Sequence, residues 1–357
     1  MLKCDFKKFI FSIALITVVI LAFYISIDNS FVNAAASKDL QISSSSNQVF
    51  VMYAASLLKT FKDSVGPLFQ KETGYTFEGE ARGSVQAANM IIDGLRRPDV
   101  FVSAGTIPII KLINGSISNS NGDVGTSTTN LAEWLVKFAS AEMVIAYSPT
   151  SHFYTDLEKA RTGEIPWYKV LSKQGFKFGR TDPELDPKGY YAIITAKLSN
   201  IYYNDSTIKQ RTLGDDRNSK QIFPEEILKT ILEQGQLDAV AAYKHEAMAR
   251  GLPYITLPPE INLGNPMFSD FYRRAFYTLG TGQVVFGEPI YFSVTIPQTA
   301  KNPNGAISFV SFLLSTRSKH ILESQGLNYI KPVIKGKTDN VPSSIRNSIL
   351  VSKSLQL

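Results

Sequence analysis

The stretch "KFGRTDPELDPKGYYAIITAKL", Lys177 to Leu198, has the pattern of a strand end, a turn with two Asp-Pro pairs and a helix. A helix N-terminus presents unpaired N–H groups and the positive end of the helix dipole, so it attracts anions. Asp186 precedes the predicted helix and can supply the negative charge itself, as a capping carboxylate. The alternative is that a bound oxyanion lies at this position.

Short apolar runs followed by helical patterns recur along the chain. The predicted strands lie at 49–53, 98–105, 141–149 and 237–243. Strands that alternate with helices predict an α/β protein with mainly parallel sheets flanked by helices.

The apolar runs at 144–147 and 255–257 bracket a middle segment, which indicates two lobes joined by two chain crossings. We expect lobe I at 48–143 and 263–335, lobe II at 144–262, and a loose polar tail at 336–357. Ligands of open α/β sheets bind beside helix N-termini, so a cleft between two lobes is the expected site.

The composition excludes several kinds of site. The single cysteine, Cys4, lies in the N-terminal segment, so the folded part has no thiol nucleophile and no cysteine metal site. The histidines His152, His245 and His320 lack metal-ligand spacing. The net charge is +6 without a run of Lys or Arg, so we expect no nucleic-acid partner. A mildly basic surface fits an anionic ligand or an anionic membrane.

The N-terminal segment predicts export. Residues 1–30 contain an uncharged 19-residue stretch, Phe9 to Ile27, after three lysines. This length is close to the roughly 20 residues of a membrane span, and small residues that a signal peptidase could cut follow it. The segment is therefore a signal peptide or a membrane anchor, and 31–47 reads as a polar tether. Both interpretations place the remainder at the extracellular face of the membrane.

Two further predicted strand-to-helix turns present serines, Ser56 in "YAASLL" and Ser84 in "EARGSVQ". Serine is a common helix cap, which is one interpretation of each. The other is a neutral cradle for an oxyanion, built from hydroxyl and main-chain N–H groups. Ala55 and Gly83 precede the serines and are small enough to let an anion approach the main chain closely.

The stretches "AASL", "GS" and "DPELDPKGY" resemble the periplasmic molybdate/tungstate-binding proteins of ABC importers, and most closely their archaeal branch. The resemblance spans about Val49 to Pro332. It implies a two-lobed type II solute-binding protein with its oxyanion in the cleft between the lobes. It also implies an ABC permease with its ATPase subunit as partners.

The resemblance implies an oxyanion site with these residues: Ser56, Ser84, Tyr243, Ala55 and the main-chain N–H groups of Lys188 and Gly189. It also implies that the Asp186 carboxylate reaches the metal of the oxyanion. A glutamate directly before the tyrosine would supply a second carboxylate, but that position is Ala242. Asp186 could then bind the metal alone, cap its helix, or donate a hydrogen bond as the neutral acid.

Neighbouring residues have simpler interpretations. We expect the Lys188 side chain in solvent and Tyr190 and Tyr191 in helix packing. Glu225 is expected in the first turn of a helix, where the dipole stabilises it. We do not expect Glu246 to replace the missing glutamate, because it lies three residues past Tyr243 and side chains alternate in direction along a strand.

These observations predict a monomeric receptor that captures molybdate or tungstate and needs no cofactor. The chain has no Walker motif and cannot supply the energy of transport itself. A receptor for phosphate or sulfate is the alternative. An exported serine hydrolase is a distant one, because there is no "GxSxG" elbow and no histidine in a triad context.

Overall fold

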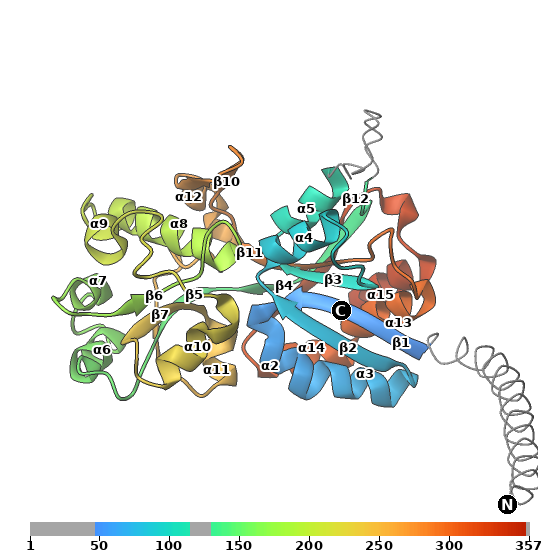
Figure 1. Ribbon diagram of the computed structural model, residues 1–357, viewed down its shortest axis with the longest axis horizontal. Coiled ribbons are helices and arrows are strands. Elements are labelled where there is room, and N and C mark those ends of the chain that lie inside the picture. Colours follow the sequence, from blue (N-terminus) through green and yellow to red (C-terminus); the bar gives the residue numbers. More distant parts are fainter. Residues whose placement is uncertain (1–46, 115–129, 355–357) are drawn as a thin grey trace, which may run out of the picture. The chain divides into compact units, whose positions relative to one another are not determined.

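The computed structural model describes residues 47–114 and 130–354 (Figure 1). The predicted signal peptide or anchor, Cys4, the tether up to residue 46 and most of the polar loop at 118–130 lie outside the described residues. The compact unit Val49–Leu357 contains nearly all residues of the six-stranded, four-stranded and two-stranded sheets. Among the described helices, none combines the length and the apolar character needed to cross a bilayer.

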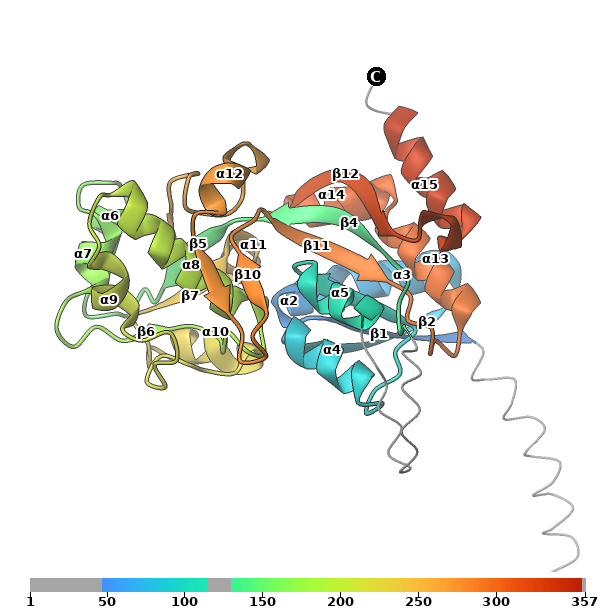
Figure 2. The same cartoon turned by 90° about the horizontal axis from the view of Figure 1, so that it is seen from above.

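A six-stranded sheet forms the first lobe, in the order β12-β4-β11-β3-β1-β2 (Figures 1 and 2). Its strands are β1 (Gln48–Ala54), β2 (Thr76–Arg82), β3 (Val100–Ala104), β4 (Trp134–Ala141), β11 (Ile290–Thr295) and β12 (Asn328–Gly336). Its helices are α2 (Leu58–Thr60), α3 (Gly66–Thr73), α4 (Ser84–Ile92), α5 (Ile107–Asn114), α13 (Pro303–Leu313) and α14 (Thr316–Ser324).

The helices of this lobe cover both faces of its sheet. On one face, Ala88 and Ile91 of α4 and Leu112 of α5 pack with Met52 and Phe101. On the other face, side chains of α3 and α13 pack on alternate residues of the same strands. The alternation follows from the two-residue period of a strand, since adjacent side chains point to opposite faces.

A four-stranded sheet forms the second lobe, in the order β6-β7-β5-β8. Its strands are β5 (Met143–Tyr147), β6 (Phe178–Gly179), β7 (Ala239–Tyr243) and β8 (Tyr254–Thr256). Helices α6 (Tyr154–Arg161), α7 (Trp167–Leu171), α8 (Pro187–Tyr202), α9 (Ile208–Leu213), α10 (Glu225–Glu233) and α11 (Lys244–Ala249) surround it. Leu228 and Leu232 of α10 cover one face, and Ile193 of α8 belongs to the cluster on the other.

The predicted α/β class is confirmed, but both large sheets are mixed and not mainly parallel as expected. Strand β1 pairs with β3 in parallel, as strand–helix–strand units require. Strand β11 arrives late in the chain and pairs antiparallel with both β3 and β4. Strand β5 likewise pairs antiparallel with β7 and β8.

The chain passes between the sheets at Glu142, the single residue between β4 and β5. Asn262, on the returning segment, donates from Nδ2 to the Glu142 carboxylate at 3.0 Å. The Asn262 carbonyl accepts from the Met143 N–H at 2.7 Å. The two passages of the chain are therefore joined to each other.

The returning segment also forms α12 (Ser269–Tyr272) and an antiparallel hairpin of β9 (Phe276–Thr278) and β10 (Val284–Phe286). The loose tail predicted for the C-terminus is wrong, since this segment forms α15 (Ser343–Ser354). Ile345 and Ile349 are four residues apart, so they share one helix face, and both are buried.

Candidate functional site

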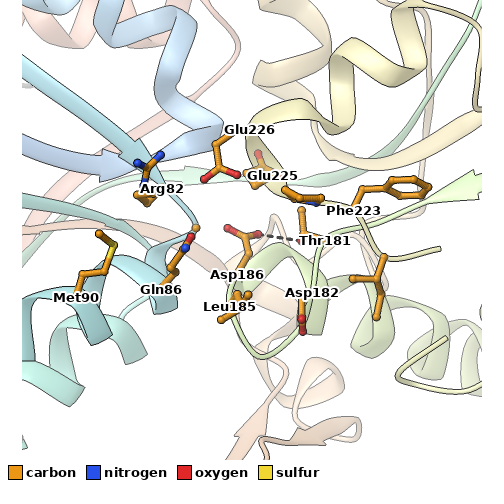
Figure 3. A pocket seen from close by; sticks show the side chains of 13 residues that line it. Arg82, Gln86, Met90, Thr181, Asp182, Leu185, Asp186, Phe223, Glu225 and Glu226 are labelled. Atoms are coloured by element: carbon orange, nitrogen blue, oxygen red, sulfur yellow. Dashed lines mark hydrogen bonds between the residues drawn. The ribbon is translucent and has the colours of Figure 1, made fainter. Parts of the chain in front are cut away.

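A cleft of about 590 Å³ lies where the two lobes meet (Figure 3). The first lobe contributes Arg82, Gly83, Gln86 and Met90, and the second contributes Thr181, Asp182, Leu185, Asp186, Ile222, Phe223, Pro224, Glu225 and Glu226. Figure 3 shows the Asp186 side chain among these residues, hydrogen-bonded to Thr181. The turn quoted above, between its strand and helix, thus forms part of the cleft wall.

The two lobes touch beside this cleft. The Gln86 N–H in α4 donates to the Leu185 carbonyl at 3.0 Å. A Cβ atom on Gly83 would lie 2.7 Å from the same carbonyl oxygen, which is closer than such contacts allow. A glycine is therefore needed at position 83 for this approach of the lobes.

Asp186 is the N-cap of α8, as one of the two sequence interpretations predicted. Its Oδ1 accepts from the Lys188 N–H at 2.9 Å and from Thr181 Oγ1 at 3.0 Å. Burial raises the pKa of Asp186, and Lys188 partly offsets this effect. The cap therefore does not require a fully ionised carboxylate, and the neutral acid would have a proton to donate.

The two predicted main-chain donors lie in the first turn of α8, and each already has an acceptor there. The Lys188 N–H donates to the Asp186 side chain, and the Gly189 N–H donates to the Asp186 carbonyl at 3.0 Å. A Cβ atom on Gly189 would lie 2.6 Å from the Thr181 carbonyl. Gly189 thus allows the helix to pack tightly against the turn that precedes it.

Ser84 is wholly buried at the start of α4, and its Oγ accepts from the Ala104 N–H at 3.0 Å. Next to Ala104, the hydroxyls of Tyr191 and Tyr190 lie 3.3 and 3.4 Å from where a Cβ atom of Gly105 would be. The rings of both tyrosines pack in the core, as predicted, and their hydroxyls lie within hydrogen-bond reach of each other. Sequence reasoning missed them as candidate donors, although both follow the Asp-Pro turn directly.

Ser56 lies in a 3-10 turn, Ala55–Leu57, that directly follows β1. Ala55 is buried, and the Ser56 Oγ is buried without a partner. The Ser56 main chain lies next to the His245 imidazole, which stacks on the Tyr243 ring at 5.7 Å between centroids. Ser56 and Tyr243 are therefore brought close to each other.

Tyr243 links the two serine regions. Its ring lies 6.1 Å from the ring of Phe292, which pairs with Ala104, the residue bonded to Ser84. The Tyr243 hydroxyl is buried and has no partner. Burial raises the pKa of Tyr243 well above its ordinary value, and the nearby Asp186 carboxylate raises it further. Tyr243 is therefore a hydrogen-bond donor at any physiological pH.

Unpartnered buried hydroxyls are uncommon in proteins, because each costs about 1–3 kcal/mol. Those of Ser56 and Tyr243 both lie where the two lobes adjoin. They can donate to an acceptor that carries several oxygen atoms.

The prediction that Lys188 extends into solvent is wrong. Its side chain is fully buried, and Nζ lies 2.6 Å from Glu225 Oε2 and 2.9 Å from Glu246 Oε2. Lys229 pairs with the same two carboxylates, at 2.8 Å from Glu246 Oε1. We call Lys188, Glu225, Lys229 and Glu246 the ion cluster. Sequence could not reveal it, because its members come from three separate helices.

Glu225 lies at the cleft, whereas position 242 lies away from it. Ala242 packs in an apolar cluster with Leu228 and Leu232, on the sheet face opposite to Tyr243. A glutamate at position 242 would therefore not reach the Tyr243 side chain. Glu225, the first residue of α10 as predicted, lines the cleft with Asp186.

Glu246 does not face the cleft and instead caps α11. Its Oε2 accepts from the Tyr243 N–H at 2.8 Å. Within residues 47–114 and 130–354, no group of three or more His, Cys, Asp or Glu side chains is arranged to hold a metal ion.

Comparisons with known proteins agree with this architecture. A family model described as bacterial extracellular solute-binding protein matches residues 49–328. The chain is 29% identical to the molybdate/tungstate-binding protein WtpA of Pyrococcus abyssi, over 86% of this chain and 91% of that protein. It is 29% identical to WtpA of Thermococcus kodakarensis, over 89% and 92%.

Two further comparisons say less about the solute. One relative has no substrate in its name, and one solved structure is similar in fold alone. An uncharacterized solute-binding protein of Petrotoga mobilis is 29% identical, over 84% of this chain and 89% of that protein. The sulfate-binding protein SubI of Mycobacterium tuberculosis superposes with a TM-score of 0.50 at 13% identity, over 85% of this chain and 91% of that one. The last comparison shows that the fold is shared.

Proposed function

The chain belongs to the family of bacterial extracellular solute-binding proteins, which are transport receptors and not enzymes, and on this premise we propose that its solute is molybdate or tungstate. The receptor delivers this oxyanion to the permease of an ABC transporter. The relatives named as molybdate/tungstate-binding proteins support this proposal across most of the chain.

The observation that carries the proposal is the set of unpartnered hydroxyls. Ser56 and Tyr243 supply buried hydroxyls that lack partners, whereas the Ser84 Oγ already accepts a bond from the Ala104 N–H. A tetrahedral oxyanion has four acceptor oxygens and would satisfy several such donors at once. Donors held in place by a folded core lose little entropy on binding.

Asp186 has a separate role in this proposal. Its Oδ1 is engaged by the cap, and burial favours the neutral acid, so the carboxyl O–H donates a hydrogen bond to an oxyanion oxygen. An ionised Asp186 would repel a dianion unless its carboxylate bonded to the molybdenum or tungsten atom of the oxyanion. Bonding of the carboxylate to the metal is the alternative.

The test is calorimetric titration of the purified full-length protein with tungstate, molybdate, sulfate and phosphate. Submicromolar binding of tungstate or molybdate, with no heat from the other two, is the expected result. Binding of sulfate or phosphate alone would reassign the receptor to another importer. The absence of binding with all four anions would refute the proposed solute class.

A further inference from the structure

Tyr190 and Tyr191 form a buried pair of hydroxyl groups near the start of α8. Both side chains are fully buried, and their rings meet edge to face at 4.7 Å between centroids. Their hydroxyls lie within hydrogen-bond reach of each other. A bond between two hydroxyls uses only one of their two protons. One O–H of the pair is therefore left to donate to a third group.

The Tyr190 hydroxyl is the free donor of the pair. Asp186 and Tyr190 are four residues apart, about one helical turn, so their side chains share a face of α8, whereas Tyr191 shares a face with Pro187. Burial raises the pKa of both tyrosines, and the bond between them adds to this effect at Tyr191 but opposes it at Tyr190. These directions are those expected when Tyr191 donates and Tyr190 accepts.

The tyrosine pair adjoins the candidate site. The Tyr190 hydroxyl lies 3.4 Å from where a Cβ atom of Gly105 would be, and Gly105 follows the residue whose N–H donates to Ser84 Oγ. Gly105 has a φ of +79°, which favours glycine, and its lack of a side chain leaves room for the hydroxyls beside the main chain. Besides burial and Asp186, both tyrosines raise the pKa of Tyr243, so they lie within electrostatic range of it.

Glu288 is the other acceptor near the pair. Besides burial, its charge raises the pKa of both tyrosines. However, its Oε1 already accepts from Thr106 Oγ1 at 3.3 Å. Within the part of the chain that the structure describes, neither tyrosine hydroxyl bonds a carboxylate. An oxyanion in the site would supply the acceptor that the free O–H lacks.

We infer that Tyr190 is a further binding residue of the candidate site, and that its hydroxyl donates a hydrogen bond to an oxygen atom of the bound oxyanion. Tyr191 is then a positioning residue, because its own hydrogen bond fixes the direction of the Tyr190 O–H. The inference rests on the proposed function, since it concerns the oxyanion of that same site. A tetrahedral oxyanion has four acceptor oxygens and can accommodate this donor beside Ser56 and Tyr243.

Calorimetric titration of the full-length protein with tungstate tests the inference through phenylalanine variants. Phenylalanine keeps the ring in the core and removes only the hydroxyl. Tyr190→Phe should weaken tungstate binding by about 10- to 150-fold, the range for losing one hydrogen bond to a charged group. Tyr191→Phe leaves the donor in place and removes only its orientation, so it should weaken binding by a smaller factor.

A double-mutant cycle tests the positioning role of Tyr191. If Tyr191 acts only through Tyr190, adding Tyr191→Phe to Tyr190→Phe should not lower the tungstate affinity further. Losses that multiply in the double variant would show that Tyr191 acts on the oxyanion independently, and would overturn its positioning role.

Tyr272→Phe is the matched control. Tyr272 is equally buried, and its hydroxyl donates to the Pro259 carbonyl, away from the candidate site. This variant should lose stability in denaturant unfolding without ligand, yet bind tungstate as the parent does. Tyr190→Phe should lose affinity whatever its effect on unfolding.

The outcomes separate this inference from the proposed function. If the wild-type protein binds none of the four anions, both fail. If it binds tungstate and Tyr190→Phe binds it equally well, the function stands and the inference alone is overturned. Lower stability of Tyr190→Phe with unchanged affinity would assign its proton to Glu288, with the same consequence. If Tyr190→Phe does not fold, Tyr191→Phe decides, because an unchanged affinity in that variant overturns the inference.

Discussion

The Gln86 N–H donates to the Leu185 carbonyl at 3.0 Å, and this bond joins the first turn of α4 to the turn that precedes α8. Its two partners belong to different lobes and both line the cleft. Any separation of the lobes at this point must break the bond, so it belongs to the closed arrangement of the cleft.

Gly83→Ala should weaken oxyanion binding. The backbone angles of Gly83, φ −53° and ψ 130°, suit alanine, so the new effects are contacts of the added methyl group with the Leu185 carbonyl at 2.7 Å and with the Asp186 Cβ at 3.3 Å. Overpacking of this kind costs about 1–3 kcal/mol, or roughly five- to 150-fold in affinity. The measurement is a tungstate titration. Gln86→Ala is the control, since it keeps the main-chain bond, and equal affinities in the two variants would refute the steric explanation.

Ser56→Ala and Ser84→Ala should have different effects on stability. Ser56→Ala removes a hydroxyl that has no partner in the protein, so it should weaken tungstate binding by about 1–3 kcal/mol with little effect on unfolding. Ser84→Ala also leaves the buried Ala104 N–H unpaired, so it should lower stability as well.

Chemical denaturation without ligand, together with calorimetry, separates the two effects. If Ser56→Ala bound tungstate as tightly as the parent protein, the Ser56 hydroxyl would not belong to the oxyanion site.

Asp186→Asn should keep both the cap of α8 and most of the affinity. Asparagine is as good an N-cap as aspartate, and its amide can donate as the neutral acid does. In the parent, the proton on Asp186 should be present below its raised pKa and lost as the pH rises through it. Tungstate affinity should therefore decline toward alkaline pH in the parent, and decline less in Asp186→Asn.

Asp186→Ala tests the same position with the cap removed. It should lower stability by about 1 kcal/mol and weaken binding more than Asp186→Asn does. A large loss of affinity in Asp186→Asn, equal to that in Asp186→Ala, would instead indicate that the carboxylate bonds to the metal.

His245 should make the protein sensitive to acid. Burial lowers its pKa from 6.5 to about 4, so the folded protein keeps the imidazole neutral. This contribution to stability is complete above pH 6.5 and is lost as the pH falls through about 4. The lower pKa in the folded state corresponds to a contribution of about 3 kcal/mol.

Denaturant unfolding at neutral pH and at about pH 4 gives the measurement. His245→Phe cannot titrate and should reduce the loss of stability between the two conditions. An identical loss in the variant and the parent would show that other groups cause the acid sensitivity.

The sequence predicted what depends on local pattern. The apolar run from Val49 to Tyr53, which a helical pattern follows in the sequence, forms β1. The Asp186-Pro187 pair marks the start of α8. The helix cap by Asp186 can be predicted from Asp186 and Pro187 alone. The α/β class follows from the same periodicity repeated along the chain.

The sequence did not reveal features that depend on distant segments. The direction of the Lys188 side chain is set by Glu225 and Glu246, which lie 37 and 58 residues further along the chain. The face to which Ala242 points depends on the register of β7 against β5. The mixed pairing of the sheets likewise depends on where β11 inserts, and no local pattern encodes that.

The position of β11 has a consequence for biosynthesis. It lies between β3 and β4, so the six-stranded sheet stays divided until residues 290–295 have left the ribosome, whereas all strands of the four-stranded sheet precede residue 257. Until then β3 and β4 each expose an unpaired, apolar edge, the kind of surface that promotes aggregation. A nascent chain truncated before Ile290 should therefore require a chaperone, although its second lobe is already complete.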